Sequence, residues 1–99
     1  MSLKIECNSE HVICYFSGAL NTEETIKIET EVFNAVKDAK SVYFDLKDTS
    51  YIASSFLRIC GKVALHRDSS TFSIINVPEN VAKILKISGL YNVFNVKEL

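Results

Sequence analysis

Two adjacent serines, Ser54 and Ser55, follow an apolar-rich segment and open a stretch with helical periodicity. The first turn of a helix leaves backbone N–H groups without partners and carries a partial positive charge. A serine oxygen there can accept a hydrogen bond and cap the helix, or it can carry a phosphate that the helix start favours. The serine pair therefore predicts either a structural cap or a regulatory phosphorylation site.

The serine pair lies between two predicted strands. Residues 41–46 and 71–77 are apolar-rich runs of strand length. Between them, apolar side chains recur at helical spacing from Ser54 or Ser55 to Arg67: Phe56, Leu57, Ile59, Cys60, Val63 and Ala64. Two strands joined through a long helix are naturally parallel, so this part of the chain predicts a βαβ unit.

The N-terminal part predicts an antiparallel hairpin and another helix. Residues 3–7 and 11–18 are apolar-rich runs separated by a turn-prone Asn-Ser-Glu. Both faces of the second run are apolar, which predicts a strand covered on two sides or paired in the middle of a sheet. Asn21 and Glu24 have the spacing of an N-cap residue and its partner, and residues 22–39 contain no Gly or Pro.

The C-terminal part predicts a third helix and a docked tail. Pro78 suits a first helical turn, and Gly89 suits a left-handed stop after the helix. Residues 91–96 are apolar enough to dock against the body as a short strand or a helical turn. We therefore expect one α/β domain over residues 1–99. Its sheet is mixed and mostly parallel, with four to five strands, an N-terminal antiparallel strand and a cover of three to four helices.

The composition excludes several classes of protein. A chain of 99 residues with 47% hydrophobic content buries one small core. Its 11 basic and 12 acidic residues nearly cancel, so we expect no nucleic-acid partner. No apolar run approaches the ~20 residues of a membrane span, and the N-terminus lacks the apolar core of a signal peptide. We expect a cytoplasmic protein without membrane insertion.

Catalytic and metal-binding motifs are absent from the sequence. The three cysteines, Cys7, Cys14 and Cys60, are widely spaced, and we expect them to be reduced core residues. No nucleophile elbow, zinc-binding helix or phosphate loop occurs, so we expect neither an enzyme nor a cofactor. A carboxylate pair or metal site at Asp45 and Asp48 is conceivable, but strand-end carboxylates commonly cap turns.

Three segments in order resemble the STAS domain of bacterial anti-sigma-factor antagonists. Residues 42–46, Val-Tyr-Phe-Asp-Leu, are similar to the family's strand ending in Asp-Leu. Residues 52–57, Ile-Ala-Ser-Ser-Phe-Leu, are similar to its Asp-Ser-Ser/Thr-Gly-Leu motif. Residues 84–90 and 93–94 are similar to its leucine-rich helix, Gly-Leu stop and Phe-containing end. The resemblance covers nearly the whole chain and implies a STAS-type fold.

In that family, a partner kinase phosphorylates the first serine of the motif, and the phosphate releases the domain from the partner. The resemblance places the phosphate on Ser54, with Ser55 as the alternative. Ala53 stands where the family has Asp, and Phe56 where it has Gly. Loss of the aspartate removes an acceptor that could orient the hydroxyl. Phe56 would plug into the core, narrow the approach to the serine or, if exposed, anchor a partner.

A basic stripe follows the serines. Arg58, Lys62 and His66 recur every fourth residue, so they can contact an acidic partner or form the solvated side of the helix. Neither His66 nor His11 has a visible catalytic partner. The predicted partner-binding residues are Ala53, Ser54, Ser55, Phe56, Arg58 and Lys62.

The resemblance implies a regulatory interaction module that binds a kinase-like anti-sigma factor or another switch protein. The alternative is an accessory STAS subunit of a bacterial lipid-transport ATPase, which docks constitutively and uses the serines only as caps. A third possibility is nucleotide binding at the helix starts near Ser54 and Pro78. A homodimer through a sheet edge or a helix is also compatible with the sequence.

Overall fold

The computed structural model of the protein describes residues 2–8, 10–65 and 67–99. The strands are β1 (Leu3–Cys7), β2 (His11–Leu20), β3 (Ser41–Ile52), β4 (Phe72–Val77) and β5 (Val96–Glu98). The helices are α1 (Thr22–Val36), α2 (Ser54–Leu65) and α3 (Glu79–Ile87), with a 3₁₀ turn at Ser69–Thr71. The five strands lie in the order β1-β2-β3-β4-β5. Strand β1 is antiparallel to β2 and the other pairs are parallel, which confirms the predicted mixed sheet.

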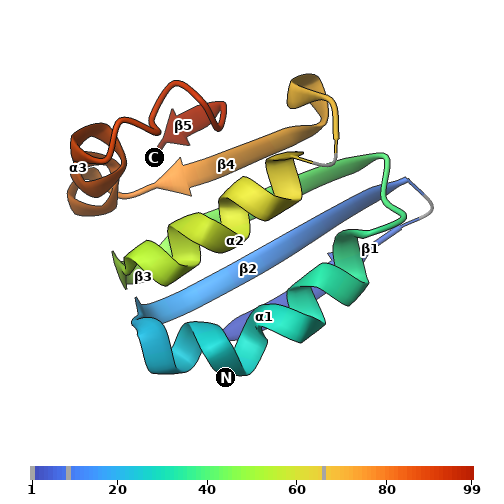
Figure 1. The fold of residues 1–99 in the computed structure, drawn as a ribbon, viewed down its shortest axis with the longest axis horizontal. Helices are drawn as coiled ribbons and strands as arrows, with labels where there is room; N and C mark the ends of the chain where they lie inside the picture. The colour runs from blue at the N-terminus through green and yellow to red at the C-terminus, as the bar shows by residue number, and fades with distance from the viewer. Residues whose placement is uncertain (1, 9, 66) are drawn as a thin grey trace.

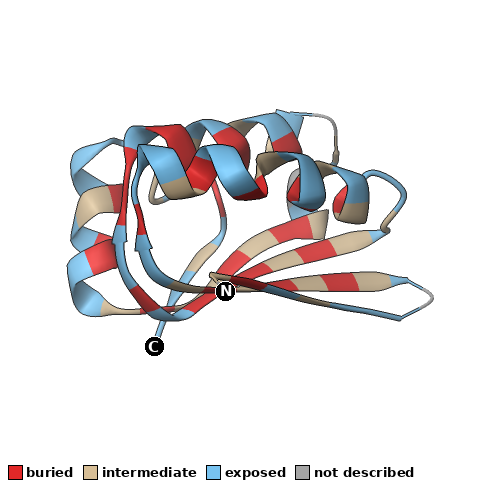
Figure 2. Cartoon of the chain, turned by 90° about the horizontal axis from the view of Figure 1, so that it is seen from below, coloured by how far each residue is buried: buried red, intermediate tan, exposed pale blue. Residues whose placement is uncertain are grey.

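Helices α1 and α2 lie side by side over one face of the sheet (Figure 1). Helix α3 lies at the end of the sheet where β3 and β4 finish. Figure 2 shows the sheet from the side, with both helices on one side of it and with buried residues alternating with half-buried ones along the strands. Strand β2 lies between β1 and β3, so the expectation of an interior strand is confirmed by its pairing rather than by a second covering layer.

Phenylalanine rings form the centre of the core beneath α2. The Phe16 ring centroid lies 5.0 Å from that of Phe44 and 5.0 Å from that of Phe56, in edge-on geometry. Phe72 extends the cluster with a centroid 5.0 Å from that of Phe44, and Phe94 lies 6.0 Å beyond Phe72. Edge-to-face pairs at these distances add stability beyond the burial of apolar area. The cluster therefore ties α2 to three strands and to the C-terminal segment.

Strand β3 is longer than predicted. It continues past Leu46 to Ile52 because its second half remains paired with β2, although its pairing with β4 stops at Asp45. Two register shifts interrupt the β2–β3 ladder, and they also disturb the alternation of buried and exposed residues in this half. Leu20 and Ile52 are paired at the end of the ladder, so α1 and α2 start from neighbouring strand ends.

Two helices end earlier than predicted. Helix α2 ends at Leu65 rather than near Arg67. Helix α1 ends at Val36 rather than near Ala39, and the Arg67 guanidinium closes it. Its Nη2 donates to the carbonyl oxygens of Val36 at 2.9 Å and Ala39 at 3.0 Å. These bonds satisfy carbonyl groups that have no partner within α1.

The C-terminal segment docks against the body as predicted. Helix α3 begins at Glu79, with Pro78 at the N-cap position rather than inside the first turn. Gly89 has a φ of +79°, which confirms the predicted left-handed stop. Phe94 is buried, and the residues after it form the short edge strand β5. Among the described residues, no helix has the length and apolar composition that a membrane span requires.

The cysteines do not all lie in the core. Cys14 and Cys60 are buried free thiols, as predicted, whereas Cys7 is exposed at the end of an edge strand. Burial, and to a smaller extent the charge of Glu31, raises the pKa of the Cys14 thiol to about 12. Burial also raises the pKa of Cys60. The expectation of a core position is therefore wrong for Cys7.

Candidate functional site

The candidate site is the junction between β3 and α2, which Ala53 forms alone. The Ala53 N–H donates to the carbonyl of Leu20 at 2.9 Å, which holds the junction against the end of β2. The Ala53 carbonyl accepts from the N–H groups of Phe56 at 3.0 Å and Leu57 at 3.3 Å. Backbone bonds therefore fix where α2 starts, and they place Ser54 at its first helical position.

The two serines have different environments. Ser54 is exposed, whereas Ser55 is only 6% exposed. Within the described parts of the chain, the Ser55 hydroxyl is buried without a hydrogen-bond partner, and the Ser54 hydroxyl makes no hydrogen bond either. Neither side chain therefore caps α2 through described residues. Only Ser54 presents its oxygen to an approaching protein.

Few groups offset the partial positive charge at the N-terminus of α2. Ala53 has a methyl group where a capping residue would offer an oxygen, and the first turn of α2 has no acidic residue. Among residues 2–8, 10–65 and 67–99, no side chain accepts a hydrogen bond from the first N–H groups of α2. The N–H groups of Ser54 and Ser55 and the helix dipole therefore remain available to a negative charge beside Ser54, whereas the Phe56 N–H bonds to the Ala53 carbonyl.

The predicted basic stripe does not form one uniform surface. Arg58 is exposed, one turn beyond Ser54. The Lys62 Nζ lies 3.7 Å from the Glu29 Oε2 and 5.8 Å from the centroid of the Phe33 ring, so Lys62 faces α1. His66 lies outside the described residues. Within the described residues, Arg58 is therefore the basic residue of the stripe that makes no ion pair with α1. Lys62 forms an exposed ion pair with Glu29, and such pairs add little stability.

The remaining predicted partner-binding residues are largely covered. Phe56 is fully buried in the phenylalanine cluster, which confirms that its side chain plugs into the core and does not anchor a partner. Ala53 is 8% exposed. The accessible part of the predicted surface therefore consists of Ser54, Arg58 and the exposed portion of Lys62.

Asp45 has a structural environment. Its Oδ1 accepts from the Lys47 N–H at 2.9 Å, and its Oδ2 accepts from the Asn76 side-chain amide at 2.8 Å. Asn76 has a φ of +53°, so this bond holds a left-handed residue at the end of β4. Asp48 is exposed, and no group of three potential metal ligands occurs in the described part of the chain. Asp45 therefore lies inside β3 rather than at a strand end, and its carboxylate supports a register shift and the left-handed Asn76 instead of capping a turn.

Two structural features near the helices were not predicted from the sequence. The Asn80 side-chain amide donates to the Ser50 carbonyl at 2.8 Å and ties α3 to the end of β3. A groove of about 330 Å³ lies between the C-terminal halves of α1 and α2, lined by Phe33, Val36, Lys37, Lys62, Val63 and Arg67. Both features combine residues from separate elements, so no local sequence motif predicts them.

Comparison with solved structures shows the same fold in bacterial regulators. An anti-sigma factor antagonist from Mycobacterium paratuberculosis matches with a TM-score of 0.85 and 16% identity, over 98% of this chain and 85% of that one. The unphosphorylated form of the anti-sigma factor antagonist SpoIIAA matches with a TM-score of 0.79 and 16% identity, over 98% and 87%. The phosphorylated form of the Bacillus cell fate determinant SpoIIAA matches with a TM-score of 0.70 and 15% identity, over 98% and 90%.

No curated protein is significantly similar to the chain in this comparison. The family model of the STAS domain, in contrast, matches residues 2–98, which include every described strand and helix. The resemblance of the three sequence segments is thereby confirmed at the level of the family and the fold. The chain belongs to the STAS domain family.

Proposed function

We propose that the protein is a cytoplasmic regulatory module that binds a protein partner and catalyses no reaction itself. The partner is a kinase-like anti-sigma factor or a related switch protein, and Ser54 is the phosphate acceptor. The observation that carries this assignment is the exposed Ser54 hydroxyl at a helix start that no described side chain caps. The anti-sigma factor antagonists that share the fold support the choice of partner class.

The geometry favours Ser54 over Ser55 as the acceptor. A kinase must reach the hydroxyl, and Ser55 is 6% exposed. A phosphate on Ser54 adds about 1.5 to 2 negative charges at the positive end of α2. The domain should therefore remain folded when it is modified. The switch then acts through the surface it presents, because the new charge repels a partner that fits the neutral hydroxyl.

The two departures from the family motif have different consequences. Ala53 supplies no carboxylate to orient the Ser54 hydroxyl, which slows phosphorylation if that orientation matters to the kinase. It also supplies no side-chain oxygen that would occupy the first N–H groups of α2. Phe56 is fully buried, so it does not obstruct the surface around Ser54. The motif has therefore lost an orienting group and kept an accessible acceptor.

Phosphopeptide mapping of the protein from its own cells tests the modification. We expect phosphate on Ser54 under at least one growth or stress condition, and none on the neighbouring Ser55. Fragment spectra must separate the two serines because one peptide contains both. A protein that carries Ser54→Ala provides the matched control. Unmodified Ser54 under every condition would remove the phosphorylation part of the proposal.

The alternative function is a constitutively docked STAS subunit of a lipid-transport ATPase. The alanine at position 53 favours it, because this residue has lost the motif's carboxylate. Such a subunit would co-purify with an ATPase component and would bind it equally well after Ser54→Asp. The anti-sigma antagonist function instead requires that Ser54→Asp weakens binding. This difference separates the two functions directly.

A further inference from the structure

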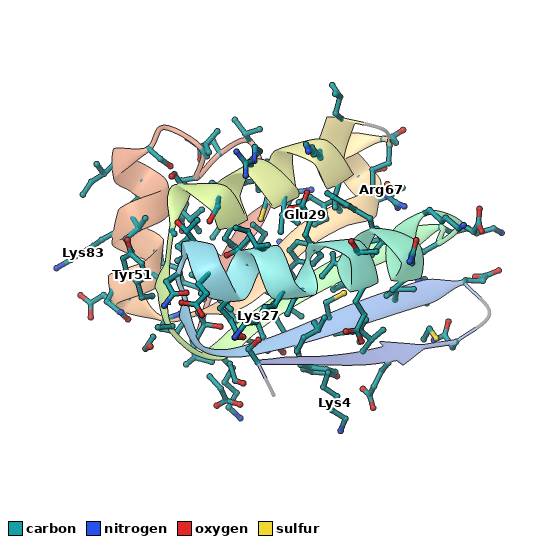
Figure 3. The ribbon with its side chains drawn as sticks, turned by 60° about the horizontal axis from the view of Figure 1, so that its bottom comes forward. Lys4, Lys27, Glu29, Tyr51, Arg67 and Lys83 are labelled. Carbon is teal, nitrogen blue, oxygen red and sulfur yellow. The ribbon has the colours of Figure 1, made fainter. Side chains whose placement is uncertain are left out.

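Strand β1 forms one edge of the sheet, and its outer side has no strand beside it within the described residues. An unpaired edge presents backbone N–H and C=O groups that can pair with another chain. Figure 3 shows Lys4 on this strand pointing away from the helices. The strand runs over Leu3–Cys7 and does not include Ser54, so the inference below is separate from the proposed function.

The pairing of β1 with β2 determines which backbone groups face outward. The Ser17 N–H donates to the Ser2 carbonyl at 2.8 Å, and the Asn8 N–H donates to the His11 carbonyl at 3.0 Å. Hydrogen-bonded pairs alternate along an antiparallel ladder, so the even-numbered residues of β1 bond to β2. The outward-facing groups therefore belong to Leu3, Ile5 and Cys7.

We propose that β1 pairs antiparallel with β1 of a second copy of the chain, with Ile5 opposite Ile5 at the two-fold axis. In this register, Leu3 lies opposite Cys7 of the second copy, and outward-facing groups meet outward-facing groups. Lys4 lies opposite Glu6 of the second copy, once on each side of the axis. The two sheets thereby join into one continuous sheet.

The charges on β1 select this register. Moving the axis by one residue in either direction sets Lys4 opposite Lys4 or Glu6 opposite Glu6, and directly opposed like charges are destabilising. The chosen register instead pairs each lysine with a glutamate in a non-hydrogen-bonded position, where Cα atoms lie about 4.5 Å apart. Both side chains are exposed, and Lys4 has no ion pair or hydrogen bond among the described residues.

The surroundings of the charges also suit a second copy. Glu6 Oε1 accepts a hydrogen bond from the Tyr15 hydroxyl at 2.8 Å, which holds the carboxylate on the face where Lys4 of the second copy arrives. Charges of one sign would protect an edge strand from pairing with itself. Opposite charges two residues apart instead complement each other across a two-fold axis. Five residues make a contact far smaller than the ~1,600 Å² of a standard interface, so the dimer forms at high protein concentration.

Sedimentation equilibrium over a wide concentration range tests the pairing through charge reversal. We expect the wild-type protein to show a dimer fraction that rises with concentration. Lys4→Glu and Glu6→Lys should each weaken association about tenfold, because each sets like charges opposite one another. A mixture of the two variants should recover association, since every opposed pair is then of opposite sign. Lys83→Glu, at an exposed lysine on α3, makes the same change in net charge as Lys4→Glu and should have no effect.

Disulfide trapping tests the position of the axis independently. With Cys7→Ser to remove the exposed thiol, Ile5→Cys should form a covalent dimer under oxidation, because opposed residues in this ladder have Cα atoms about 5.5 Å apart. The wild-type Cys7 faces Leu3 of the second copy and should cross-link less readily. Three results would overturn the inference: a monomer at every concentration, association that charge reversal leaves unchanged, or cross-linking at Cys7 but not at position 5.

Discussion

Helices α1 and α2 start from the ends of paired parallel strands, but their first turns differ in how the backbone is satisfied. At the start of α1, the Asn21 Oδ1 accepts from the Glu24 N–H at 2.9 Å, and Glu23 and Glu24 add negative charge to the first turn. At the start of α2, the N-cap position holds Ala53, and no acidic residue lies in the first turn. One helix start is closed by its own side chains, and the other is open.

This difference indicates where a phosphate fits. Thr22 and Ser54 are both exposed hydroxyl residues at the first position of their helices. A phosphate on Thr22 would meet Glu23, Glu24 and an N–H group that Asn21 already occupies. A phosphate on Ser54 would meet free backbone donors and no acid in the first turn. The side chains around a helix start, rather than the hydroxyl itself, therefore distinguish a candidate switch from a structural terminus.

Removing Phe56, which packs beneath the start of α2, should lower the stability of the protein most. Phe56→Ala deletes a fully buried ring from the phenylalanine cluster, so we expect a loss of about 3–5 kcal/mol in the free energy of unfolding. Denaturant titration followed by circular dichroism measures it. Phe33→Ala removes a half-buried ring between the helices and should cost less. Equal losses for the two variants would contradict the assigned role of the cluster.

Removing the side-chain oxygen at each helix start should lower stability at the start of α1 and leave it nearly unchanged at the start of α2. Asn21→Ala abolishes the cap of α1 and should cost about 1 kcal/mol of stability. Ser54→Ala removes a hydroxyl that makes no described hydrogen bond, so its effect should stay within about 0.5 kcal/mol. The same denaturant titration measures both variants. If Ser54→Ala cost as much as Asn21→Ala, Ser54 would be a cap.

Adding a charge at each helix start should produce a smaller difference of opposite sign. Ser54→Asp should stabilise the protein by about 0.3–1 kcal/mol at low salt, because it places a carboxylate at the uncompensated end of α2. Thr22→Asp should gain less, since Glu23 and Glu24 already lie there. Added salt should reduce the gain. Thermal unfolding at two ionic strengths checks this, and a gain for Thr22→Asp that matches the gain for Ser54→Asp would contradict it.

The fold was largely predictable because its local signals agree with one another. The N-cap at Asn21, the apolar stripe of α2 and the stop at Gly89 each depend on short-range geometry, and the structure confirms all three. The Glu24 carboxylate accepts from the Ser2 hydroxyl rather than from the Asn21 N–H, so the reciprocal half of the predicted cap does not form. The extent of β3 was not predictable, because residues 47–52 stay extended only through pairing with β2. Tertiary contacts of this kind leave no periodic pattern in the strand itself.

The candidate site was predictable in position and not in detail. The sequence located the helix start, but the rotation of α2 against the sheet decides that Ser54 is exposed and Ser55 is buried. The same rotation places Phe56 in the core, where the sequence left core and partner anchor as alternatives. The Lys62 side chain points toward Glu29 because α2 packs against α1. The two residues lie on different helices, far apart in the chain, so no local pattern predicts this contact.

Affinity capture from native cell extract tests the central claim most directly. The baits are the wild-type protein, Ser54→Ala, Ser54→Asp and Thr22→Asp, which places the same charge at the start of α1. We predict that a kinase-like regulator is captured by the wild type, Ser54→Ala and Thr22→Asp and is lost only with Ser54→Asp, because the start of α2 is open and the start of α1 is closed. Capture of the same partners by all four baits would contradict the claim and would identify a constitutive docking subunit.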